Sequence, residues 1–215
     1  MIYVLNATGR LTKYEEKIRS IITEAVSLYS TIHSFSDIDI VVAENPSMTV
    51  PEHGVGGYTA TAHEVYISLD INRDDIETMI SEHLGPTIAH ELTHIIRLQI
   101  GKKLAVEGTL ADNVIGEGLS DTVSMSLYPD QNTPWIKNLT DEQFVEMKKV
   151  FIAQHDNTYY DHNAWFYGNK EAGIYRWTGY SLGYALIKDY LNEHPSLTIK
   201  DLVPLDTKEL MSVWL

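Results

Sequence analysis

Two histidines four residues apart, with a glutamate beside the first, are the strongest chemical signal in this sequence. They form the H-E-x-x-H pattern His90-Glu91-Leu92-Thr93-His94. Residues four apart on an α-helix are separated by about 40° around its axis, so both imidazoles face one way and can bind one metal ion. The pattern therefore predicts a helical metal site, with Glu91 placed to reach a metal-bound water. The aliphatic residues of this segment fall about 140° to 280° from His90, on another face of the helix: Ile88, Ala89, Leu92, Ile95, Ile96 and Ile100.

A catalytic zinc ion needs a third protein ligand and one open position for water. The extended motif H-E-x-x-H-x-x-G-x-x-H is absent, because Arg97 and Ile100 stand where Gly and His would be. Two carboxylates further along the chain remain as candidates, Glu117 and Asp112. Asp112 completes the G-T-x-x-D pattern of aspzincins, but it also stands where the next helix is expected to begin, and Asp is a favoured N-cap. We therefore favour Glu117 as the third ligand.

The residues around Glu117 support a functional helix face. Asp121 lies four residues on, so the two carboxylates share one side of the predicted helix. Gly116 and Gly118 flank Glu117, and each costs a helix interior about 1 kcal/mol relative to Ala. We expect this cost to be tolerated because another backbone approaches the helix closely there.

The elements that must position these side chains follow from hydrophobic periodicity and from breakers. They predict an α+β fold, with a small N-terminal mixed sheet, an active-site helix and a mostly helical C-terminal half. Thr12 and Thr140 are expected to cap helices. Strands are predicted at 2–5, 38–42 and within 58–69, and helices at about 12–29, 74–83, 86–100 after a break at Gly85-Pro86, 113–128, 140–154 and 181–191, with an irregular aromatic segment at 155–177.

Length and composition limit the classes of protein. The 215 residues, 44% of them hydrophobic and 21% charged, suit one globular domain over 1–215, with a cleft between an α+β lobe of about 1–103 and a helical lobe of about 104–215. Without cysteine, any metal must be held by His and carboxylates. The formal charge of −14 disfavours nucleic acid and anionic membrane surfaces as partners. No window is apolar enough to span a bilayer and no secretory signal is recognisable, so we expect a cytoplasmic protein.

H-E-x-x-H followed by E-x-x-x-D on a later helix resembles the gluzincin arrangement of thermolysin-like zinc peptidases. With Gly179-Tyr180-Ser181-Leu182-Gly183-Tyr184, the chain most resembles a bacterial family of predicted zinc-dependent proteases of otherwise unassigned function. The resemblance implies a zincin-like fold and Zn²⁺ as the cofactor. It also implies the site residues: His90, His94 and Glu117 as zinc ligands, Glu91 as the general base and Asp121 as a carboxylate that orients a ligand imidazole.

Gluzincins also stabilise the oxyanion of the reaction with a Tyr or His from the C-terminal part of the chain. The candidates in this sequence are Tyr180, Tyr175, His162 and His155. We favour Tyr180 as this catalytic residue because it lies in the segment that carries part of the family resemblance.

The predicted substrate is a peptide or protein that adds a strand to a sheet edge. Residues 57–62, after a glycine cluster, are the candidate edge, although they also suit a plain hairpin. Two alternatives to a peptidase stay open: a zinc-stabilised regulatory or binding protein, and a zinc hydrolase of a non-peptide amide. A structural zinc site has no use for a base at Glu91, which separates the first alternative from an enzyme.

Overall fold

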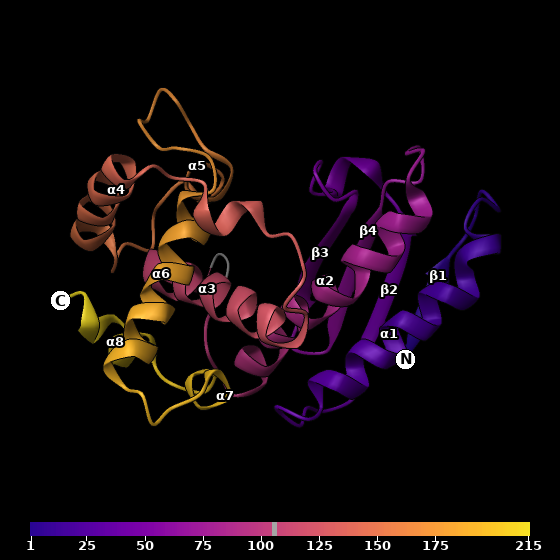
Figure 1. Ribbon diagram of the computed structural model, residues 1–215, viewed down its shortest axis with the longest axis horizontal. Helices are drawn as coiled ribbons and strands as arrows, with labels where there is room; N and C mark the ends of the chain where they lie inside the picture. The colour runs from indigo at the N-terminus through magenta and orange to yellow at the C-terminus, as the bar shows by residue number, and fades with distance from the viewer. Residues whose placement is uncertain (105–106) are drawn as a thin grey trace. The chain divides into compact units, whose positions relative to one another are not determined.

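The computed structural model describes residues 1–104 and 107–215 (Figure 1). Its chain is α+β, with a small four-stranded mixed sheet followed by mostly helical sequence, which confirms the predicted fold class. Two compact units divide the chain. The first combines Met1–Gln99 with Val123–Gln131, and the second combines Ile100–Thr122 with Asn132–Leu215. The predicted cleft between two lobes stays a prediction.

The sheet of the first unit has the strand order β1-β2-β4-β3. Its strands are β1 (Ile2–Leu5), β2 (Asp39–Glu44), β3 (Val55–Thr61) and β4 (Glu64–Leu69). The pairs β1·β2 and β2·β4 are parallel, and β3 pairs antiparallel with β4, with a bulge between Thr59 and Thr61. β3 is therefore an edge strand of the described sheet.

The two faces of this sheet differ because successive side chains of a strand point to opposite sides. On one face the aliphatic residues of β2 and β4 are buried, and α2 (Ile76–Gln99) packs on β3 and β4 while α1 (Glu15–Tyr29) packs on α2 (Figure 1). The other face carries one row across all four strands, in which Tyr3, Val41, Tyr66 and Tyr58 stand opposite one another. The three tyrosines of the row are exposed.

The predicted break at Gly85-Pro86 is wrong, because α2 is one helix from Ile76 to Gln99 with Pro86 inside it. A proline within a helix removes one backbone donor and usually kinks or ends it. Here the surrounding residues are buried, and the Ser124 hydroxyl donates to the Pro86 carbonyl at 2.8 Å. Tertiary packing therefore outweighs the local preference to end the helix.

Two smaller expectations also change. The first helix begins as a 3₁₀ turn over Thr12–Tyr14, and Thr12 does not cap it, because its hydroxyl donates back to the carbonyl of Gly9. The irregular segment 155–177 contains a short helix, α5 (His162–Tyr167), whose N-terminus is capped by the side chain of Asp161. By contrast, Thr140 forms the predicted cap of its helix, in a capping box with Gln143.

The second unit is built on helices around one hydrophobic core. They are α3 (Leu110–Leu127, of which residues 123–127 belong to the first unit), α4 (Asp141–Gln154), α5, α6 (Thr178–Glu193), α7 (Ile199–Leu202) and α8 (Thr207–Leu210). Short 3₁₀ turns of this unit lie at Pro134–Lys137 and Met211–Val213, and the first unit has one at Pro46–Met48. The largest fully buried aromatic side chains of the core are Phe151, Trp165 and Phe166.

α3 and α6 cross at two glycines. A Cβ on Gly118 would lie 2.2 Å from the carbonyl carbon of Gly183, and a Cβ on Gly183 would lie 2.1 Å from the carbonyl oxygen of Val114. No side chain fits at such distances, so the two backbones touch. We predicted a close approach from both glycines that flank Glu117, and it is confirmed at Gly118.

Within the described residues, no helix has both the length and the apolar character that crossing a bilayer requires.

Candidate metal centre

α2 presents the two histidines of the H-E-x-x-H pattern side by side. Their Nε2 atoms are 3.2 Å apart, and their rings meet edge to face at a centroid distance of 5.0 Å. The helix takes this orientation because Ile88, Leu92 and Ile95 on its other face are fully buried. His94 is itself buried.

Glu117 on α3 completes a group of three potential ligands. One ligand atom from each of His90, His94 and Glu117 lies within 4.8 Å of the others. Within the described part of the chain, this is the one cluster of three or more His, Cys, Asp or Glu side chains that meets this distance criterion. The cluster contains the three residues predicted as ligands from the sequence.

The geometry of these residues suits a zinc ion. Tetrahedral zinc with Zn–N distances of 2.0–2.1 Å places two coordinating imidazole nitrogens about 3.3 Å apart. The observed separation of 3.2 Å between the two Nε2 atoms is close to that value. Two imidazoles and one carboxylate also form the ligand set of a known class of catalytic zinc site, which leaves one position open for water.

Asp112, the alternative third ligand, is engaged elsewhere. Its Oδ2 accepts hydrogen bonds from the backbone N–H and the hydroxyl of Thr109, at 2.9 and 2.8 Å. Its backbone N–H in turn donates to the Thr109 hydroxyl, and its Oδ1 accepts from the hydroxyl of Thr207. This is the reciprocal pattern of a capping box, in which Thr109 is the cap and Asp112 its partner. Asp112 therefore stabilises the start of α3 and is not part of the ligand cluster.

Glu91 is buried, with only 5% of its surface exposed, and strand β3 holds its carboxylate. The hydroxyl of Thr59 lies 2.7 Å from Glu91 Oε2 and donates to it. The other oxygen lies against Gly57, where a Cβ would be only 2.3 Å from Oε1. The carboxylate therefore lies between the hydroxyl of Thr59 and the backbone of Gly57, which are on the same strand.

The backbone groups of β3 alternate between its ladder with β4 and the outer edge of the sheet. The N–H of Asp70 donates to the carbonyl of Gly54, directly across the β3·β4 ladder. Because the hydrogen-bonding direction alternates along an antiparallel strand, the backbone groups of Val55, Gly57 and Thr59 point away from β4. Val55 agrees with this, since its carbonyl accepts a hydrogen bond from a residue outside the sheet. The backbone of Gly57 and Thr59 thus faces the edge while both residues contact Glu91.

Asp121 is buried and is bound by an indole. The Trp135 Nε1–H lies 3.0 Å from each Asp121 oxygen and donates to this carboxylate. The Trp135 ring packs edge to face on Trp177, with centroids 5.8 Å apart. The role of Asp121 toward a ligand imidazole stays a prediction, and Trp135 is one donor that holds its carboxylate.

The four candidates for oxyanion stabilisation lie in different surroundings. His155 bonds to the carbonyl of Ile152, and the Tyr175 hydroxyl donates to Glu146 on α4. Tyr180 packs edge to face on Phe166, and its catalytic role stays a prediction.

His162 is the fourth candidate, and its surroundings include the charge of Glu117. Its ring stacks on Phe166 at 4.4 Å. Burial lowers the pKa of the His162 imidazole, and the charge of Glu117 opposes that shift. Burial also raises the pKa of the neighbouring Tyr160 phenol, and Glu117 adds to that rise.

Two contacts of the site are not predicted from the sequence, that of Thr59 with Glu91 and that of Trp135 with Asp121. Thr59 lies in the segment predicted as a candidate edge, so alternation along that strand was the available signal for a side chain directed at α2. Trp135 gave no such signal, because it reaches Asp121 from a 3₁₀ turn fourteen residues away.

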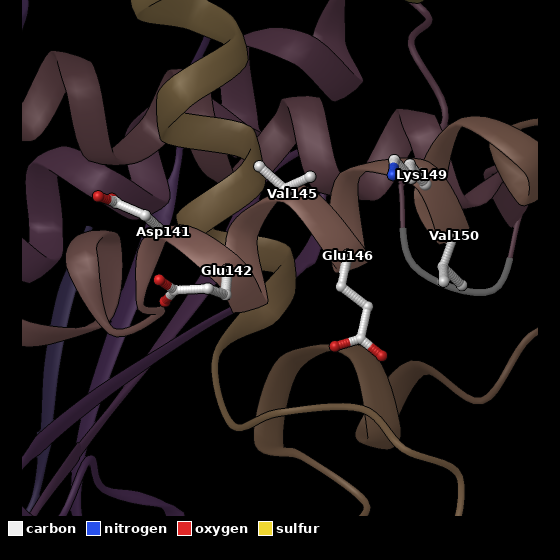
Figure 2. Close-up of a pocket in the computed structure, with 6 residues that line it drawn as sticks. All are labelled: Asp141, Glu142, Val145, Glu146, Lys149 and Val150. Carbon is white, nitrogen blue, oxygen red and sulfur yellow. The ribbon is translucent and has the colours of Figure 1, made fainter.

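A second group of acidic residues, on α4, borders a shallow hollow (Figure 2). Its carboxylates are exposed and project along the helix without converging on one point (Figure 2). The hollow is lined by Asp141, Glu142, Val145, Glu146, Lys149 and Val150. It holds no imidazole and is a less suitable site for a transition metal.

Comparison with known proteins shows the family to which this chain belongs. A family model described as "Predicted Zn-dependent protease (DUF2268)" matches residues 18–212. YjfC of Bacillus subtilis (strain 168), which is described as uncharacterized, is 26% identical over 135 residues, covering 58% of this chain and 45% of YjfC. The chain thus spans less than half the length of that curated relative. No solved structure matches the chain.

Proposed function

We propose that this chain, which belongs to the family of predicted Zn-dependent proteases, is a gluzincin-type peptidase that hydrolyses peptide bonds. His90, His94 and Glu117 would hold the catalytic zinc ion, and Glu91 would be the general base. The single observation that carries the proposal is the convergence within 4.8 Å of three ligand atoms, two from α2 and one from α3, together with the buried Glu91 on α2.

A bound zinc ion would supply a water of lowered pKa and would polarise the scissile carbonyl. Glu91 would move the protons. Its Oε2 accepts the Thr59 hydroxyl, so Oε1 is the oxygen available to take a proton from the attacking water. The same oxygen would then deliver the proton to the leaving amide nitrogen.

The substrate we propose is an extended peptide paired with the outer edge of β3. Backbone groups of Gly57 and Thr59 point to that edge, and both residues contact Glu91. Strand addition satisfies the peptide's own N–H and C=O groups and places its backbone next to the base. The acidic balance of the chain, −14, favours neutral or basic peptides over acidic ones.

The test compares wild type with Glu91→Gln. Protein purified without added metal is measured by elemental analysis and incubated with a peptide mixture whose products are identified by mass spectrometry. We expect one zinc per chain in both proteins, and a loss of hydrolysis of about 10²–10⁴-fold in the variant. Full activity in Glu91→Gln would exclude this mechanism. Zinc binding in a wild type that cleaves no peptide would favour a structural ion or a different amide substrate.

A further inference from the structure

We infer that Thr59 is a positioning residue that couples the pairing of a peptide along β3 to the orientation of Glu91. The inference rests on the proposed function, because it assigns Thr59 a part in the same reaction. Thr59 would touch neither the ion nor the reacting atoms. It would act through the base.

The contact between Thr59 and Glu91 is short and buried. The Thr59 Oγ1 lies 2.7 Å from Glu91 Oε2 and 3.1 Å from the backbone carbonyl oxygen of Glu91. A hydroxyl has one proton, and the shorter, charge-assisted bond to the carboxylate is the stronger of the two. With Glu91 only 5% exposed, water cannot replace this donor freely.

Gly57 restricts the other half of the same carboxylate. A methyl group at this position would lie 2.3 Å from Oε1 and 2.6 Å from Cγ of Glu91. Gly57 and Thr59 are two apart on the strand, so both face α2. One strand therefore sets the position of both carboxylate oxygens, through a donor at one and a steric limit at the other.

Thr59 also connects this contact to the substrate edge. Its side chain faces Glu91, whereas its backbone N–H and C=O point away from β4. The β-bulge between Thr59 and Thr61 interrupts the ladder immediately afterwards. A peptide that pairs with the outer edge would order this irregular end of the strand and, with it, the hydroxyl that fixes the base.

The experiment uses the zinc-loaded full chain and three variants. Thr59→Val removes the hydroxyl at nearly constant volume, Thr59→Ser restores it, and Thr8→Val makes the same change at an exposed hydroxyl that donates to Glu44, outside β3. A hydrogen bond to a charged group is typically worth about 10- to 100-fold in an equilibrium or rate. We expect kcat to fall by that factor in Thr59→Val, with KM changed less than about threefold.

The serine variant and the control distinguish a role of Thr59 in positioning Glu91 from a role in the folding of the protein alone. Thr59→Ser should recover most of kcat, and Thr8→Val should match wild type. Zinc affinity, measured by competition with a chelating dye, should be equal in all four proteins. An unchanged kcat in Thr59→Val, alongside a loss in Glu91→Gln, would overturn the inference and leave the proposed function intact.

A second measurement does not depend on activity. A double-mutant cycle of Thr59→Val and Glu91→Ala, read by denaturant unfolding, should show a coupling of about tenfold in the unfolding equilibrium constant. Additive effects would overturn the inference. If wild type cleaves no peptide while the coupling is present, the proposed function fails and the link between Thr59 and Glu91 stands.

Discussion

Helices α3 and α4 begin alike and carry acidic residues at similar density, yet only one of them has the features of a reactive site. Both start with a threonine in a reciprocal cap, Thr109 with Asp112 and Thr140 with Gln143. The carboxylates of α3 are buried or half-buried, and each lies by a defined partner. Those of α4 are exposed around a shallow hollow (Figure 2), although Glu146 among them accepts a hydrogen bond from the Tyr175 hydroxyl.

This difference shows that the burial of a carboxylate indicates a reactive site better than its position beside a surface hollow does. Removing a carboxylate from water is expensive unless donors or a cation compensate for it. A solvated carboxylate has no such cost and needs no partner. The burial of Glu117 and Asp121 therefore indicates a functional site. The presence of acidic residues on α4 is explained by solvation and by the favourable interaction of negative charge with a helix N-terminus.

The largest effect is expected when one carboxylate is removed from each helix, which tests whether only the carboxylate of α3 binds zinc. Glu117→Gln should lower zinc affinity by more than about 100-fold. Even the loss of a residue that only hydrogen-bonds to a metal ligand lowers metal affinity by about 10- to 100-fold, and a ligand should matter more. Glu146→Gln on α4 should leave zinc affinity unchanged. Titration of metal-free protein with zinc, followed by calorimetry, measures both. Equal affinities in the two variants would show that Glu117 is not a ligand.

Gly118→Ala tests the packing that carries Glu117. The new methyl group would overlap the backbone of Gly183, so we expect the free energy of unfolding to fall by about 3 kcal/mol. Val145→Ala, at an exposed position of α4, should change it by less than about 0.5 kcal/mol. Denaturant unfolding followed by circular dichroism measures both values. A Gly118→Ala protein as stable as wild type would mean that α3 and α6 are further apart than described.

Trp135→Phe removes the indole donor of Asp121 and keeps an aromatic ring against Trp177. The buried carboxylate loses a hydrogen bond, so we expect stability to fall by about 1–3 kcal/mol. The additional change Asp121→Asn should then cost less than it does in wild type, because the two residues act together. Thermal unfolding of the four proteins tests this, and full additivity would contradict the contact.

The smallest effect is expected at the starts of the two helices. Thr140→Ala should destabilise α4 by about 1 kcal/mol through loss of its cap. Thr109→Ala should cost more, because it removes both a cap and a donor to the half-buried Asp112. A larger loss from Thr140→Ala in parallel unfolding curves would reverse the ranking of the two helices.

Local patterns predicted the parts of this protein that local forces decide. The spacing of His90 and His94 places both on one helix face whatever the rest of the chain does, and Thr140 caps the residues directly after it. Pro86 shows where local rules fail. Its preference to end a helix is real, but buried neighbours on both sides hold α2 together.

Contacts made by tertiary packing could not be predicted in this way. That Thr59 meets Glu91 depends on which strand packs against α2, and that Trp135 meets Asp121 depends on the path of a loop. The mutual approach of Gly118 and Gly183 is an intermediate case. The glycine beside Glu117 indicated that a backbone must come close, but the sequence did not identify α6 as that backbone.

The glycine crossing also limits how related sequences can diverge. Neither Gly118 nor Gly183 can acquire a side chain while the other helix stays in place, because the new side chain would meet the backbone of that helix. A homologue with a larger residue at either position is therefore expected to have shifted α6 away from α3. Residue size at these two alignment columns would then separate relatives that inherit the same helix arrangement from those that have drifted from it.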